Sequence, residues 1–193
     1  MLELQRFLIK DKASSPKTVA VMDLDTRVQV GVARQIPAWF ARWVAAFIGK
    51  QFLPITVEAR ETEDESLVFT IRGSAGWWHR RIEVFDADER LVGWCTCSLS
   101  SRAPNPRLYD GLGQWFAEVR GEWKKGHFAF VNPDSREVGI VTREWSGPGK
   151  EQLTSAGDYA LAFHDELINQ PLAKMLLLAT ALALGTVYDV ELG

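Results

Sequence analysis

Two aspartates at the end of an apolar run have the spacing of a catalytic pair. In "TVAVMDLDT" (18–26), Asp23 and Asp25 stand two positions apart after a hydrophobic stretch and are followed by Thr26. Around a bound Mg²⁺, the first carboxylate could act as a nucleophile on a phosphoryl group and the second as an acid or base. This pattern is the strongest indication of enzymatic chemistry in the chain.

The sequence that follows Asp25 favours a simpler interpretation. The pattern resembles the nucleophile motif of haloacid-dehalogenase-type phosphotransferases, but that fold alternates strands with helices. Here the motif runs straight into a second strand-like stretch, "VQVGVA" (28–33). Aspartate is frequent in β-turns because its side chain accepts hydrogen bonds from the next backbone groups. We therefore predict a β-turn between two strands, no catalytic residues, and a protein that is not an enzyme.

The histidines and cysteines do not have the spacing of a metal site. His79, His127 and His164 are scattered along the chain,. Cys95 and Cys97 lie two apart in an alternating stretch, where a disulfide is awkward and no second pair completes a zinc site,. We predict reduced structural thiols, which suit the cytoplasm, and no bound metal or cofactor.

Two clusters of aromatic and basic residues are candidates for contact with a lipid or a partner. The first lies in "IPAWFARWVAAFIGKQFL" (36–53), where apolar residues recur at helical spacing, and the second follows a glycine-containing turn,. In an amphipathic helix, aromatic side chains can enter a lipid interface while basic ones meet headgroups. Packing against the rest of the protein explains the same pattern, so both interpretations stay open. The candidate contact residues are Trp39, Arg42, Trp43, Phe47, Lys50, Trp77 and Trp78.

These clusters must be positioned by a chain that consists mainly of short strands. Alternating apolar and polar residues, separated by turn-forming residues, predict eleven strands, and their short spacing favours antiparallel hairpins. The predicted strands cover residues 5–10, 17–23, 26–33, 55–59, 66–72, 80–86, 90–99, 113–120, 127–132, 136–145 and 158–163.

The carboxy-terminal segment from Pro171 to Asp189 predicts a helix that is apolar all round. Lys174 is the one charge between Pro171 and Tyr188. Asn169 is a candidate N-cap, and Gly185 stands near the end,. Such a helix must be wrapped by protein or by lipid. Because the apolar run is at the short limit of what spans a bilayer, we predict that protein wraps it.

Length, composition and charge fit one compact domain over residues 1–193. The chain has 193 residues, 47% of them hydrophobic, and a formal net charge of -3,. This slight acidity argues against nucleic acid as a partner. The first twelve residues lack the long apolar core of a secretory signal, so a cytoplasmic location is expected.

The carboxy-terminal third resembles the phospholipid scramblase family, within the tubby-like and LURP-one-related superfamily. The resemblance is carried by "VGIVTREWSGPGKEQLTSAGDYALAF" (138–163) and by the apolar helix after it. Within that stretch the residues that match the family pattern are Gly139, Val141, Arg143, Trp145, Gly147, Glu151, Leu153, Thr154, Ala156, Tyr159, Leu161 and Phe163.

The resemblance implies a mostly β fold, a closed antiparallel barrel of about twelve strands wrapped around the carboxy-terminal helix. The helical spacing in residues 36–53 adds one amphipathic helix to this expectation,. The resemblance also implies a role at phospholipid membranes, with the protein cytoplasmic or peripheral at the membrane. The alternative is a soluble protein-interaction module without lipid transport. The family's acidic, calcium-linked segment has Ser155 and Gly157 at its acidic positions here. Because Ca²⁺ needs several charged oxygen ligands, this difference argues against calcium as a cofactor.

Overall fold

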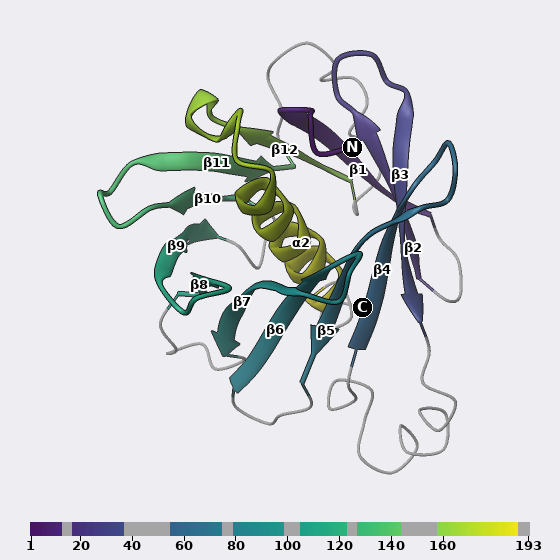
Figure 1. Ribbon diagram of the computed structural model, residues 1–193. Helices are drawn as coiled ribbons and strands as arrows, with labels where there is room; N and C mark the ends of the chain where they lie inside the picture. The colour runs from purple at the N-terminus through teal and green to yellow at the C-terminus, as the bar shows by residue number, and fades with distance from the viewer. Residues whose placement is uncertain are drawn as a thin grey trace.

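Twelve antiparallel strands form a closed barrel in the computed structural model, which describes residues 1–12, 17–36, 55–74, 79–98, 105–122, 127–143 and 158–188. Each strand pairs with the next one along the chain, and β12 pairs with β1 to close the barrel (Figure 1). The strands are β1 Arg6–Lys12, β2 Thr18–Asp23, β3 Gln29–Ile36, β4 Ile55–Glu61, β5 Leu67–Gly73, β6 His79–Asp86, β7 Leu91–Ser98, β8 Arg107–Asp110, β9 Trp115–Glu122, β10 His127–Val131, β11 Glu137–Thr142 and β12 Tyr159–Phe163.

The two-residue period of the strands separates the barrel interior from its outer wall. In β4, for example, Val57 and Ala59 are buried in the core, whereas Glu58 and Arg60 alternate with them and form an ion pair at 2.8 Å. The same alternation recurs around the barrel because successive side chains of a strand point to opposite faces. The predicted fold class, a closed antiparallel barrel around a helix, is confirmed.

Helix α2 (Pro171–Tyr188) runs through the interior of this barrel (Figure 1). Leu177, Leu178 and Leu182 are fully buried, so protein wraps the helix as predicted. The backbone N–H of Lys174 donates to the carbonyl of Gln170 at 3.0 Å, which makes Gln170, rather than the predicted Asn169, the N-cap,. Within the described parts of the chain, no helix combines the length and the hydropathy needed to cross a bilayer.

The wall of the barrel approaches α2 closely at Gly93 in β7. A Cβ at this position would lie 2.4 Å from the carbonyl oxygen of Tyr109 and 3.0 Å from Cδ2 of Leu176. On another side of the helix, the hydroxyl of Tyr159 donates to the carbonyl of Ala181 at 3.1 Å. The absence of a side chain at one contact and a buried hydrogen bond at another therefore fix the helix against the wall.

The amino-terminal turn lies against the start of α2 through the one charge of that helix. Lys174 is fully buried, and its Nζ donates to the carbonyl oxygens of Leu2, Glu3 and Leu4 at 3.1, 3.5 and 3.3 Å. Burial lowers the pKa of this ammonium below its ordinary value of 10.5, while the Glu3 carboxylate opposes the shift,. The first residues of the chain thus satisfy a charge that would otherwise be isolated in an apolar core.

Two details of the predicted element order need correction. Strand β8 was not predicted, because four residues, "RLYD", are too few to show an alternating pattern after Pro106. Ile36 ends β3, although the sequence placed it at the start of an amphipathic helix. The rest of that predicted helix, residues 37–53, lies outside the described residues.

Replacement of Gly93 by alanine should destabilise the protein much more than replacement of Gly73. The new Cβ at position 93 would overlap backbone and the buried Leu176, an overpacking that costs about 1–3 kcal/mol,. At Gly73 the closest atom would be 3.7 Å away, so Gly73→Ala should stay within about 1 kcal/mol of wild type,. Urea unfolding of both variants measures the difference, and equal stabilities would contradict the close packing of α2 on β7.

Lys174→Met should lower the free energy of unfolding by about 1–3 kcal/mol, because it leaves three carbonyls of the amino-terminal turn without their donor,. Thr180→Val is a matched control. Thr180 is also fully buried in α2, but its hydroxyl donates to a carbonyl of the same helix at 2.8 Å. The control should lose less than about 1 kcal/mol. A Lys174→Met protein as stable as the control would show that the ammonium does not hold the turn.

Candidate functional site

The candidate contact residues named from the sequence cannot be placed. Trp39, Arg42, Trp43, Phe47, Lys50, Trp77 and Trp78 all lie outside the described residues, so their role stays a prediction. The strands that flank them are described: β3 ends and β4 begins on either side of the first cluster, and β5 and β6 flank the second. Because neighbouring strands are antiparallel, these four strand ends lie at the same end of the barrel.

Asp23 and Asp25 form a turn, as the sequence predicted. The Asp23 carboxylate accepts hydrogen bonds from Thr26 Oγ1 at 2.6 Å and from the Asp25 backbone N–H at 3.0 Å. The carboxylate of Asp25 points to Arg6, at 2.9 Å, and both side chains are partly exposed. The two carboxylates therefore have structural partners, and their arrangement does not present a nucleophile beside a base.

Hydrogen bonding keeps Asp23 ionised although it is buried. Burial raises the pKa of this carboxyl. The hydrogen bonds from Thr26 and from the backbone of Asp25 and Thr26, together with the charge of Arg6, lower the pKa by more than burial raises it,. The net result is a pKa below the ordinary value of 3.8. The carboxylate thus stabilises the turn at neutral pH.

The other chemically capable side chains are dispersed as well. His127 Nδ1 lies 3.1 Å from Thr142 Oγ1, and His164 Nε2 lies 3.0 Å from Glu137 Oε1. Cys95 is buried and forms no disulfide, while the side chain of Cys97 lies outside the described part of the structure. Among the described residues, no group of three or more His, Cys, Asp or Glu side chains is arranged to hold a metal ion.

The calcium-linked segment cannot be compared in full, because Ser155 and Gly157 lie outside the described residues. Asp158 is buried directly before β12. Asp165 and Glu166 are exposed in a short 3-10 helix, η4 (Asp165–Leu167), and Glu166 lies 3.9 Å from the guanidinium of Arg136. Asp165 and Glu166 therefore lie on the surface between β12 and α2.

One outer wall of the barrel carries a cluster that sequence analysis did not assemble. Across β7, β8 and β9, Trp94 pairs with Tyr109 and Tyr109 pairs with Trp115, so that three aromatic side chains form one row. The rings of Trp94 and Tyr109 are stacked, with centroids 5.5 Å apart and planes at 18°. Arg81 and Arg107 lie over Trp94 and Trp115, at 4.2 and 5.6 Å from the ring centres. We call these five residues the aromatic–arginine face.

Two residues of this face could be recognised in the sequence, but their position beside each other could not be predicted. Arg81 belonged to the second cluster of aromatic and basic residues, "WWHRR" (77–81), and the alternation around Cys95 puts Trp94 on the opposite side of β7,. Tyr109 belongs to β8, which was not predicted. A β-bulge between β8 and β9 then sets Trp115, rather than Phe116, opposite Tyr109.

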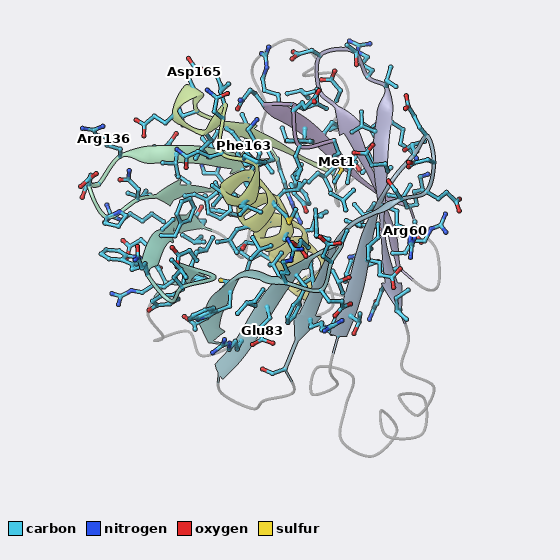
Figure 2. All side chains as sticks on the ribbon, viewed as in Figure 1. Met1, Arg60, Glu83, Arg136, Phe163 and Asp165 are labelled. Atoms are coloured by element: carbon cyan, nitrogen blue, oxygen red, sulfur yellow. The ribbon has the colours of Figure 1, made fainter. Side chains whose placement is uncertain are left out.

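The connections that lead from an even-numbered strand to the next odd-numbered strand lie at one end of the barrel, and this end is strongly acidic. These are the connections β2–β3, β4–β5, β6–β7, β8–β9 and β10–β11, together with the segment from β12 to α2. Arg136 and Asp165, labelled in Figure 2, belong to it. We call it the acidic end, because its exposed residues comprise three arginines, Arg27, Arg90 and Arg136, and nine acids, Asp25, Glu63, Asp64, Glu65, Asp88, Glu89, Asp134, Asp165 and Glu166.

The chain matches a known protein family over its carboxy-terminal part. Residues 78–189 match the family model described as Scramblase, a span of more than half of the chain that includes the aromatic–arginine face. No curated protein and no solved structure matches the chain.

Asp23→Asn should destabilise the protein at neutral pH by about 1–3 kcal/mol, because the amide binds Thr26 and the backbone N–H groups less strongly than the carboxylate,. Since the pKa of Asp23 is lower in the folded state, its contribution is complete above 3.8 and is lost as the pH falls through the folded value,. Urea unfolding at pH 7 and near pH 3 measures this. A variant more stable than wild type at pH 7 would contradict the structural role and indicate a strained, functional carboxylate.

Proposed function

The chain belongs to the scramblase family, and we propose from that premise that it is a non-enzymatic domain that binds the surface of phospholipid bilayers. The observation that carries the proposal is the family match itself, which spans strands β6 to β12 and the buried helix α2. On this proposal the protein is cytoplasmic and peripheral, and it acts through contacts on its outer surface.

Binding is better supported than movement of lipid through the protein. A headgroup that crosses hydrocarbon needs a polar path. The described interior is filled by α2 and by apolar side chains, including Phe7, Phe69 and Phe130, which are fully buried. The one ammonium in the interior, within the residues described, is that of Lys174, and it is held by backbone carbonyls.

Co-sedimentation of the purified protein with vesicles tests the proposal. We expect the protein to sediment with vesicles of a neutral and an anionic phospholipid, more strongly when the anionic fraction is larger. The same result is expected with calcium and with a chelator, because the acidic positions of the family segment are Ser155 and Gly157 here,.

The predicted helix cluster is tested in the same assay. Trp39→Ala/Trp43→Ala should weaken sedimentation if those side chains meet lipid, provided that circular dichroism shows retained folding. Failure of wild type to sediment under any condition would contradict the proposed function and favour the alternative, a protein-interaction module. A strict requirement for calcium would contradict our reading of Ser155 and Gly157.

A further inference from the structure

We propose that the aromatic–arginine face, on the outer wall of β6 to β9, is the surface that lies on an anionic phospholipid bilayer. This inference rests on the proposed function and specifies the part of the molecule that performs it. None of its five residues is among the seven candidate contact residues, although Arg81 belongs to the cluster "WWHRR" (77–81) that contains two of them.

The face consists of two parallel rows of side chains with different chemistry. In the first row Trp94, Tyr109 and Trp115 are cross-strand neighbours. In the second row Arg81 pairs with Thr96, and Thr96 pairs with Arg107. The rows are two residues apart along each strand, or about 7 Å. Aromatic rings with polar edges beside guanidinium groups match the boundary between the acyl chains and the phosphates of a bilayer.

The arginine row is placed to receive phosphate groups. Arg81 and Arg107 lie on either side of Thr96, whose side chain is exposed and whose hydroxyl donates only a long hydrogen bond of 3.4 Å to the carbonyl of Arg107. About half of each guanidinium side chain is exposed. A phosphodiester above Thr96 would therefore have two cationic donors and a hydroxyl within one small area.

The carboxylates around Thr96 do not cancel the positive charge of the arginines there. Glu83 pairs with Arg81 at 2.9 Å. Glu118 forms ion pairs with two arginines, Arg120 at 2.5 Å and Arg107 at 3.9 Å. Around Thr96, three guanidinium groups thus face two carboxylates, whereas the other carboxylates of these strands, Asp86, Asp110 and Glu122, stand at strand ends. The middle of the wall is therefore locally cationic in a chain whose formal net charge is -3, as a contact with anionic lipid requires,.

Two of the six large apolar side chains that are exposed among the described residues lie at this wall, and one of them, Leu112, is the most exposed of the six. Trp115 is 41% exposed, and Leu112, at the tip of the hairpin between β8 and β9, is 86% exposed. This hairpin connection, residues 111–114, carries no charge, in contrast to the other connections described at the acidic end. Burial of these side chains in an interface would add a hydrophobic contribution to the electrostatic one.

The acidic end fixes the orientation of the molecule on the membrane. Its nine carboxylates would be repelled by an anionic surface, so the charged connections of this end should stay in water, and only the uncharged β8–β9 connection beside the wall should touch the lipid,. The wall of β6 to β9, where Glu83 is labelled in Figure 2, can lie on the membrane while most of the acidic connections remain in water. The contact is therefore lateral, with the barrel on its side.

The test compares two pairs of charge-matched variants in vesicle co-sedimentation. Arg81→Gln/Arg107→Gln removes two charges from the face. Arg90→Gln/Arg136→Gln removes two exposed arginines from the acidic end and changes the net charge by the same amount. With vesicles that contain an anionic phospholipid, the first pair should bind roughly 10- to 30-fold more weakly than wild type, as expected for two arginines at a charged membrane surface. The second pair should bind like wild type.

A second comparison separates apolar contact from charge. Leu112→Ser should weaken binding to neutral as well as anionic vesicles, whereas Ile168→Ser, a substitution at another exposed aliphatic residue, should have no effect. Thermal unfolding verifies that all variants are folded.

The outcomes distinguish this inference from the proposed function. If wild type binds and both arginine pairs bind equally well, or lose binding equally, the face is not the contact, although the protein still binds lipid. If wild type does not bind anionic vesicles, the proposed function fails and the inference fails with it. Weaker vesicle binding of Arg81→Gln/Arg107→Gln and of Leu112→Ser, with unchanged binding of Arg90→Gln/Arg136→Gln and of Ile168→Ser, supports both the proposed function and the proposed contact face.

Discussion

The structure depends on the need to enclose a helix that is apolar on every side. Helix α2 has no polar stripe to present to water, so its burial requires a wall all around it. The pairing of β12 with β1 supplies that wall by closing the sheet. At Gly93 the wall has no side chain, which leaves space for Leu176. Where the helix carries its one charge, Lys174, the carbonyls of the amino-terminal turn receive it. Closure, close packing and the position of the first residues all follow from the same constraint.

Enclosure of the helix also limits where function can reside. As far as the structure describes it, the interior is filled by α2 and by apolar side chains, so our proposal places the lipid contact on the outer surface. The acidic end is unsuited to anionic lipid, whereas the wall of β6 to β9 combines aromatic rings, exposed guanidinium groups and the uncharged hairpin tip at Leu112. The structural role of α2 and the lateral contact we propose are therefore two consequences of one architecture.

Sequence alone predicted what depends on local pattern and missed what depends on cross-strand register. Alternation identified eleven strands, and the continuous apolar run identified a helix wrapped by protein. Strand β8 escaped because four residues carry too little pattern, and without it Tyr109 could not be recognised as the link between Trp94 and Trp115. The turn at Asp23 was predicted correctly because side-chain capping of a turn is a local interaction. Candidates such as Trp39 and Trp77 remain predictions, since they lie outside the described residues.

The most direct test of the central claim, that the protein lies on lipid through the aromatic–arginine face, is the depth of single residues in the membrane. A fluorophore attached to Leu112→Cys in a Cys97→Ser background would be compared with one attached to Ile168→Cys, using vesicles that carry a nitroxide quencher in the headgroup region. We expect quenching of the label at position 112 and little quenching at position 168. Quenching at position 168 alone, or at neither position while the protein remains bound, would contradict the claim.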